Sequence, residues 1–257
     1  MASPTAAGQA LLDSFESIRI INMAHRGDRR REMAAQLARL GLGFDHPQIS
    51  LFTAKRFTEA AGFPTVGTRG CFDSHLSLLK EAAAQGRQTL LILEDDCNFD
   101  DEIETLLPVA LAELGQRDWQ ILHGSLLPGH YSPTERPLDP VDPEAALRGT
   151  HFLAFRGPVI AQAAAYFEAM AKRTPGQQHP DGEPMHYDGA LCVFRQRHPH
   201  IVTYAANPDL GHQRLSRTDI HDVRFYDRLP VLRSVTSLAR RVVRLTGRTR
   251  QMGKKQI

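Results

Sequence analysis

The sequence is poor in cysteine, and its cysteines are not paired in the way that structural cysteines are. Cys71, Cys97 and Cys192 are spread over 257 residues and show no CxxC spacing. Disulfide frameworks and zinc sites of the ribbon or finger type need cysteines in pairs, so the spacing argues against both. It favours a protein that works in a reducing compartment.

Long apolar runs are missing as well. No stretch approaches the ~20 apolar residues of a membrane-spanning helix. The first residues lack the basic start and the apolar core of a signal peptide. We therefore expect a cytoplasmic protein, which the basic C-terminus described next would bring to the inner face of the membrane as a peripheral protein.

Acidic residues are absent after Asp227. Nine Lys and Arg residues lie in residues 228–257, so the net charge of +2 divides into −7 for residues 1–227 and +9 for the tail. Leucine and valine alternate with these cations, which is typical of an amphipathic helix lying on an anionic membrane. A disordered tail or a contact between subunits explains the pattern equally well. Nucleic acid is not an expected partner, because the rest of the chain is acidic and carries no nucleic-acid-binding motif.

What the chain does contain is an alternation of strand-like and helix-like segments. The spacing of apolar residues predicts strands at 17–23, 49–52, 89–93, 119–123, 150–155 and 201–205, and helices at 28–40, 72–84, 101–114, 159–172 and 187–195. Such alternation predicts one α/β domain with a mainly parallel sheet and helices on both faces. We expect a flexible N-terminus over residues 1–16, the α/β domain over 17–227 and the basic helical tail over 228–257.

One strand runs directly into three acids. Leu90 to Leu93 are apolar and are followed by Glu94, Asp95 and Asp96. The apolar run indicates a buried parallel strand, and the carboxyl ends of such strands are where open α/β sheets bind ligands. Two interpretations stay open from these residues alone: a solvated acidic turn before the next helix, and a site for Mg²⁺ or Mn²⁺ that holds a nucleotide-sugar diphosphate.

Two other interpretations of the acidic run fail. An EF-hand loop starting at Asp96 would need Gly at its sixth position and Glu at its twelfth, where the chain has Asp101 and Leu107. A phosphoryl-accepting receiver domain would carry its acids after the first strand, but nearly ninety residues precede this one.

Five short motifs occur in a fixed order between about residues 18 and 221. They are Ile21-Asn22-Met23 with Asp28-Arg29, the segment Gly67 to His75, the segment Leu93 to Asp96, Asp118-Trp119, and Pro208 with Gln213 and Ser216 to Ile220. Their order and spacing resemble glycosyltransferase family 25, which includes lipooligosaccharide and collagen galactosyltransferases. The chain departs from the family pattern at Thr68, where Glu is usual, and at Gln120, where an acid is common.

The resemblance implies a GT-A-like (Rossmann-like) fold and a metal-dependent, inverting transferase. Its donor would be a UDP-sugar carrying galactose or glucose, and its acceptor a hydroxyl of lipopolysaccharide or another cell-surface glycan. Mn²⁺ or Mg²⁺ would bind at Asp96, with Glu94 and Asp95 supporting the metal or contacting the donor. The two departures motivate an alternative, a catalytically inactive module that binds a nucleotide sugar or acts as a scaffold.

The resemblance also implies roles on the donor side. Asn22, Arg26 and Arg29 follow the first strand, where Asn22 would meet the base or ribose and an arginine the phosphates; capping of the next helix is the alternative. Ser74 and His75 are donor-site candidates, although a buried, purely structural His75 is nearly as good an interpretation.

Candidates for the remaining roles come from the second half of the chain. Asp188 is the candidate general base for the acceptor hydroxyl, and its alternative is an ordinary acid in the first turn of a helix. His212 is a candidate metal ligand. Gln213 and Asp219 would contribute to the donor side, Asp219 as part of a C-terminal flap over the diphosphate.

Overall fold

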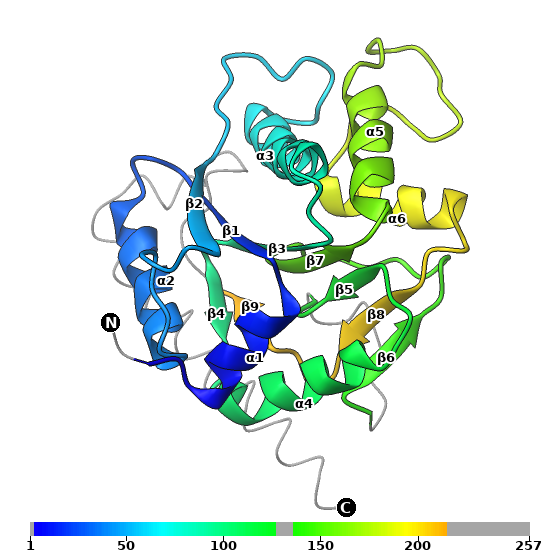
Figure 1. Ribbon diagram of the computed structural model, residues 1–257. Helices are drawn as coiled ribbons and strands as arrows, with labels where there is room; N and C mark the ends of the chain where they lie inside the picture. Colours follow the sequence, from blue (N-terminus) through cyan, green and yellow to red (C-terminus); the bar gives the residue numbers. More distant parts are fainter. Residues whose placement is uncertain (1–2, 127–135, 215–257) are drawn as a thin grey trace, which may run out of the picture. The chain divides into compact units, whose positions relative to one another are not determined.

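The computed structural model describes residues 3–126 and 136–214. Asp219, the Ser216 to Ile220 motif, the predicted boundary at residue 227 and the basic tail lie outside these residues and stay predictions. Seven strands form one central sheet in the order β2-β1-β3-β7-β5-β8-β6 (Figure 1). The strands are β1 (Ser17–Asn22), β2 (Ile49–Thr53), β3 (Thr89–Glu94), β5 (Ile121–His123), β6 (Leu138–Val141), β7 (Phe152–Arg156) and β8 (Thr203–Ala206).

The sheet is mainly parallel, as the alternating pattern predicts. β1 pairs parallel with both β2 and β3, and β5 pairs parallel with β8. β7 lies antiparallel between β3 and β5, and β6 pairs antiparallel with β8. Five strands therefore run in one direction, and β7 and β6 run in the other.

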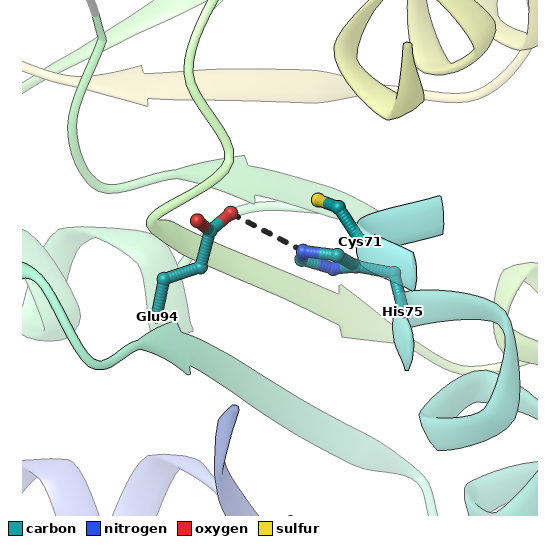
Figure 2. Close-up of side chains that lie close together, drawn as sticks. All are labelled: Cys71, His75 and Glu94. Atoms are coloured by element: carbon teal, nitrogen blue, oxygen red, sulfur yellow. Dashed lines mark hydrogen bonds and ion pairs between the residues drawn. The ribbon is translucent and has the colours of Figure 1, made fainter. Parts of the chain in front are cut away.

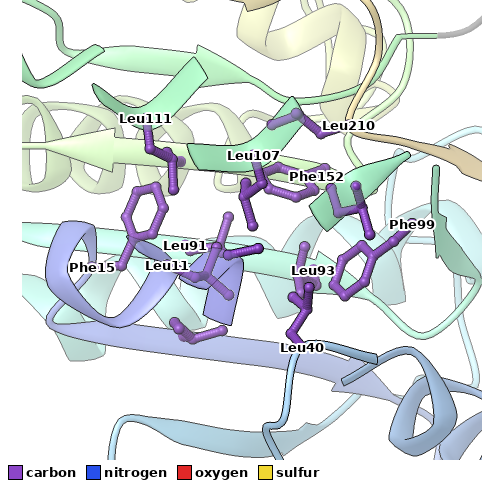
Figure 3. Close-up of a cluster of buried hydrophobic side chains, with 14 of the residues drawn as sticks. Leu11, Phe15, Leu40, Leu91, Leu93, Phe99, Leu107, Leu111, Phe152 and Leu210 are labelled. Carbon is purple, nitrogen blue, oxygen red and sulfur yellow. The ribbon is translucent and has the colours of Figure 1, made fainter. Parts of the chain in front are cut away.

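Helices cover both faces of the sheet, which confirms the α/β class (Figure 1). They are α1 (Ala6–Ser14), α2 (Gly27–Arg39), α3 (Val66–Ala84), α4 (Ile103–Gly115), α5 (Val159–Ala171) and α6 (Tyr187–Arg197). One buried cluster joins the sheet to α1, α2 and α4, and a second joins it to α3, α5 and α6. Figure 3 shows the first cluster, in which side chains of α1 and α4 meet those of β3.

The apolar run of β3 has a direct structural explanation. Leu91 and Leu93 point into the cluster with α1 and α4, whereas Leu90 and Ile92 point into the cluster with α3 and α5. All four are 0% exposed. Because successive side chains of a strand point to opposite faces, a strand covered on both sides needs apolar residues at every position.

The expected flexible N-terminus is wrong for residues 6–14, which form helix α1. The Thr5 hydroxyl caps the helix by accepting a hydrogen bond from Gly8 N (3.1 Å), and Leu11 and Phe15 are fully buried. Gly8 packs so closely on the Leu40 carbonyl that a Cβ would clash there. The Phe15 ring meets Trp119 edge to face at 6.4 Å. The N-terminal segment thus completes the core.

Three further features depart from the sequence-based expectations. β6 lies between the predicted strands at 119–123 and 150–155, where the spacing predicted neither strand nor helix. Helix α3 begins at Val66, six residues earlier than expected, with Thr65 as its cap. A second small sheet pairs β4 (Cys97–Phe99) with β9 (Gly211–Gln213) in antiparallel fashion. Among the described residues, no helix is both long and apolar enough to cross a membrane.

Candidate functional site

The carboxyl ends of β1 and β3 lie side by side, because the two strands are parallel neighbours in which Ile21 is in register with Glu94. The Asp95 backbone N–H donates to Ile21 O at 3.1 Å. The Asn22 side-chain amide donates to Asp95 Oδ2 at 2.7 Å. Two residues predicted on the donor side therefore meet directly, and both are buried.

Arg29 of α2 adds a cation to this pair. Its Nη1 lies 2.9 Å from Asp95 Oδ1 and 3.1 Å from Asp96 Oδ2. The three side chains are at most 10% exposed. Moving charged groups out of water costs free energy, so buried charges are usually paired. Here one guanidinium faces two carboxylates. With both carboxylates ionised, the site would have an excess of negative charge.

Asp96 is the carboxylate on which that excess would lie. Its Oδ1 is buried and has no hydrogen-bond partner among the described residues, while Gln213 Nε2 lies at the outer limit of hydrogen bonding from Oδ2, at 3.5 Å. Burial raises the pKa of Asp96 to about 7, the nearby charge of Glu94 adds to the rise, and Arg29 opposes it. An unpartnered, buried carboxylate oxygen fits a hard divalent cation, which often takes only one or two carboxylates from the protein.

Glu94 belongs to a different network on the other side of the strand end. Burial alone raises its pKa, but the hydrogen bond and charge of His75, together with the Thr150 hydroxyl, lower the pKa to about 2. Thr150 Oγ1 donates to Glu94 Oε1 at 2.7 Å, and His75 Nε2 lies 3.3 Å from the same oxygen. A carboxylate only accepts, so Nε2 carries the proton.

His75 is fixed in place by its neighbours. It is 0% exposed, and its ring stacks on Tyr187 at 4.2 Å with an interplanar angle of 16°. Cys71 lies one helical turn earlier on α3, and its sulfur approaches the same histidine and Glu94 (Figure 2). Sequence reasoning missed Cys71, because its one available signal, the four-residue spacing from His75, is common in helices.

A buried relay of two hydrogen bonds, through His151 and Ser125, holds β9 in place. His151 Nε2 lies 2.7 Å from Ser125 Oγ, and Ser125 Oγ donates to Gly211 O at 2.5 Å. The Glu94 N–H donates to His151 O at 3.1 Å. The single hydroxyl hydrogen goes to the carbonyl, so His151 Nε2 must supply the other one. The relay thus ties β9 to the strand end that carries the acids.

Comparison with known proteins shows which family the first half of the chain resembles. Residues 15–138 match the family described as "Glycosyltransferase family 25 (LPS biosynthesis protein)". These residues are called the family 25 segment below, because they match that family. This confirms the resemblance seen in the motifs. The family 25 segment contains Asn22, Arg29, His75 and the acidic triplet, and it ends before Asp188 and β9.

Curated relatives share part of this segment. Procollagen galactosyltransferases 1-B and 1-A of Xenopus laevis are 29% and 27% identical to the chain over 128 residues, which is 43% of this chain. The match spans 21% of the length of each relative, so the chain corresponds to about a fifth of those proteins. A solved glycosyltransferase involved in glycosylation of the major capsid of PBCV-1 is 9% identical, with a TM-score of 0.37 over 74% of this chain and 93% of that one.

Two residues of the family 25 segment predicted on the donor side have local partners. Ser74 Oγ donates to Gly70 O at 2.6 Å and accepts from Lys55 N at 2.9 Å, so this fully buried hydroxyl links α3 to the segment after β2. Arg26 pairs with Asp28 through Nη2 at 2.8 Å, and this bond lowers the pKa of Asp28. The structure brings neither side chain to Asp96 through a contact that it records.

The candidates beyond the family 25 segment come from two places. Asp188 lies in the first turn of α6 directly after Tyr187, is half-buried, and accepts a hydrogen bond from Gly189 N at 2.8 Å. Its negative charge acts on Cys71, which places it on the His75 side of the site. His212 lies on β9 opposite Asn98 of β4. β9 borders the acidic triplet, because Arg214 N donates to Asp96 O at 2.7 Å.

Arg214 was not predicted, although it follows Gln213 directly. Its guanidinium donates to Asn98 Oδ1 from Nε at 3.0 Å and from Nη2 at 2.6 Å, and it pairs with Glu32 of α2. It therefore joins β9, β4 and α2 around the backbone of Asp96. No local pattern in the sequence marks such a three-way contact.

Proposed function

We propose that the protein is a glycosyltransferase that moves a hexose, galactose or glucose, from a UDP-sugar to a hydroxyl of lipopolysaccharide or another cell-surface glycan, with inversion. The family 25 segment supports the reaction class. The observation that carries the site is Asp96 Oδ1 just after β3, which is buried and has no hydrogen-bond partner within residues 3–126 and 136–214. Donor sugar, acceptor and inversion follow from the family resemblance.

In this proposal, different residues of the chain bind the metal, orient the acids and accept the proton. Asp96 would hold Mn²⁺ or Mg²⁺, with His212 and Gln213 approaching from β9, and the bound ion would offset charge on the diphosphate as the sugar departs. Asn22 fixes Asp95 by a hydrogen bond, and Arg29 holds both aspartates in one orientation. Asp188 would accept the proton of the acceptor hydroxyl.

The second candidate function is the inactive module that binds a nucleotide sugar or acts as a scaffold. Arg29 already supplies a cation between Asp95 and Asp96, and this favours a site that needs no metal. Thr68, which replaces the usual Glu, is buried and bonded to the Thr65 cap, where it stabilises the start of α3. Its hydroxyl supplies no negative charge.

Calorimetry with UDP, with and without Mn²⁺, separates the two functions when combined with an assay of UDP release from UDP-galactose and UDP-glucose. The transferase predicts Mn²⁺-dependent UDP binding, slow hydrolysis of one donor, and loss of both in Asp96→Asn. Asp118→Asn is the matched control, because Asp118 is an exposed acid whose side chain accepts a hydrogen bond from Gln120. UDP binding that does not depend on Mn²⁺, with no turnover of either donor, would favour the inactive module.

A membrane location is part of the same proposal. An acceptor such as lipopolysaccharide is embedded in a membrane, so a basic tail over residues 228–257 would bring the enzyme to its substrate. The support is the charge pattern of the sequence.

A further inference from the structure

Three different metal-binding side chains meet beside the acidic strand end. Cys71 and His75 are four residues apart on α3 and so share one helix face. Glu94 ends β3 and points at them (Figure 2). The sulfur, a ring nitrogen and a carboxylate oxygen all lie within 4.8 Å of one another.

The chemistry of this donor set differs from that of Asp95 and Asp96. A thiolate, an imidazole and a carboxylate together suit a borderline-soft ion such as Zn²⁺, which takes N, S and O ligands in tetrahedral geometry. Asp95 and Asp96 offer oxygen alone, which suits Mg²⁺ or Mn²⁺. Two cation sites of different preference would therefore lie at one end of β3.

We infer that Cys71, His75 and Glu94 form a site for a thiophilic divalent cation of the Zn²⁺ class, with its fourth position open to water. This goes beyond the proposed transferase function, which uses the oxygen ligands of Asp96. Binding converts the Cys71 thiol to a thiolate and releases its proton to solvent, as is general for metal-bound cysteine.

The arrangement needs only a small contraction to close on an ion. Bond lengths of about 2.0–2.3 Å in a tetrahedron put ligand atoms roughly 3.5 Å apart. His75 is fully buried and stacked on Tyr187, so it gives the site a fixed point. Cys71 and Glu94 are less tightly enclosed than His75, so they are the ligands that would move toward an ion.

The neutral His75 ring can bind a cation by changing its tautomer. Nε2 now carries a hydrogen toward Glu94 (Figure 2). Nδ1 is buried and has no hydrogen-bond partner among the described residues. For a cation to bind at Nε2, the single ring proton must move from Nε2 to Nδ1, which gives the other neutral tautomer and leaves the ring without a net charge.

The surrounding charge attracts a cation. Glu94, Asp188 and Asp96 all act electrostatically on the Cys71 sulfur as negative groups. A divalent ion bound to one thiolate and one carboxylate is neutral as a unit, so it would relieve this repulsion. Occupancy would also draw Glu94 away from Thr150, which now bonds its Oε1 at 2.7 Å.

Cobalt titration of the full, metal-free chain tests the inference. Co²⁺ bound by a thiolate gives a charge-transfer absorption in the near ultraviolet together with tetrahedral visible bands. We expect one equivalent to produce both, and Zn²⁺ to displace it. Twelve histidines also bind metals weakly, but imidazole alone produces no sulfur band.

Matched variants show whether Cys71 or another cysteine supplies the sulfur ligand. Cys71→Ala should abolish the sulfur band and weaken Zn²⁺ binding by at least ~100-fold, because losing a ligand should cost more than the 10–100-fold of an outer-shell change. Cys192→Ala should keep both, since Cys192 is a partly exposed thiol bonded to Leu147 instead. Cys71→Ser, checked by circular dichroism, serves if the alanine variant does not fold.

The outcomes are distinct from those of the transferase test. Asp96→Asn should retain the cobalt–sulfur band even where Mn²⁺-dependent UDP binding is lost. Absence of the band in the unmodified protein, or its persistence in Cys71→Ala and Cys71→Ser, would overturn the inference.

Discussion

Asn22 and Asp95 are 73 positions apart in the sequence, and their side chains are joined by a hydrogen bond of 2.7 Å in the interior of the protein. The bond exists because β1 and β3 are parallel neighbours that end at the same edge of the sheet. It aims Asp95 toward Arg29 and leaves Asp96 as the carboxylate whose Oδ1 has no partner in the described part of the chain.

Removing the Arg29 cation should destabilise the protein in a way that a metal repairs. Arg29→Gln leaves two buried carboxylates without their partner, and breaking a buried pair costs about 3–5 kcal/mol. We expect thermal denaturation to show a lower Tm without metal and a partial recovery with Mn²⁺, which would bind more tightly once its competitor is gone. Arg30→Gln, at an exposed neighbouring position, should change neither value. If added Mn²⁺ does not change the Tm of the Arg29→Gln protein, the metal site proposed at Asp96 is contradicted.

Replacing the proposed base should slow turnover without weakening the donor complex. Asp188→Asn is expected to lower kcat for UDP release in the presence of Mn²⁺ by 10²–10⁴-fold, the usual contribution of general base catalysis. UDP affinity, measured by calorimetry, should be unchanged. Glu183→Gln is the matched control, because Glu183 is an exposed acid in the segment leading to the same helix. Equal rates for Asp188→Asn and the unmodified enzyme would exclude this base.

Acid should destabilise the fold through His123. Burial lowers the pKa of His123 to about 3, with the charge of Arg195 adding to the effect, whereas an unfolded histidine titrates near 6.5. Between these values the unfolded state binds the extra proton, so stability is intact above about pH 6.5 and falls as the pH drops toward 3. The slope from one such group reaches about 1.4 kcal/mol per pH unit.

Urea denaturation between pH 4 and 8 checks this, with His123→Leu as the comparison. The leucine variant should lose most of the added pH dependence, apart from the contribution of His151, whose pKa burial also lowers. Parallel stability profiles for the two proteins would show that His123 is not the group responsible.

Deleting residues 228–257 should reduce membrane binding and leave donor binding intact. Each Lys or Arg near an anionic surface contributes about 1 kcal/mol, and the tail carries nine of them. Co-sedimentation with vesicles containing phosphatidylserine should show loss of binding on truncation and with added salt. Neutral phosphatidylcholine vesicles are the control. Full and truncated chains that sediment alike would refute a membrane role for the tail.

Much of the fold was predictable because it follows from local patterns. The apolar run at Leu90–Leu93 fixes β3 as a strand covered on both faces, and the acids after it mark the ligand end of the sheet. Helix α1 was missed although signals were present: Thr5 is a good cap, and Ala7 and Leu11 have helical spacing. β4 and β9 could not be predicted, because three-residue strands exist only through pairing across more than a hundred positions.

The site was predictable as a region and not as a set of contacts. Asn22 next to Asp95 follows from parallel strands ending together. Arg29 between the two aspartates does not, since a helix after the first strand can direct an arginine to phosphate or to carboxylate alike. The meeting of Cys71 with Glu94 is equally hidden, because it depends on how α3 packs on the sheet.

The double coverage of β3 has a consequence for the timing of events at the site. A strand clamped between two cores exchanges its amide hydrogens only when the protein opens as a whole. The acids that follow it are therefore aligned before any ligand binds, and the entropy lost in ordering them is part of the free energy of folding. Adaptation to different ligands would then fall to the surrounding segments, while this end of the sheet stays rigid.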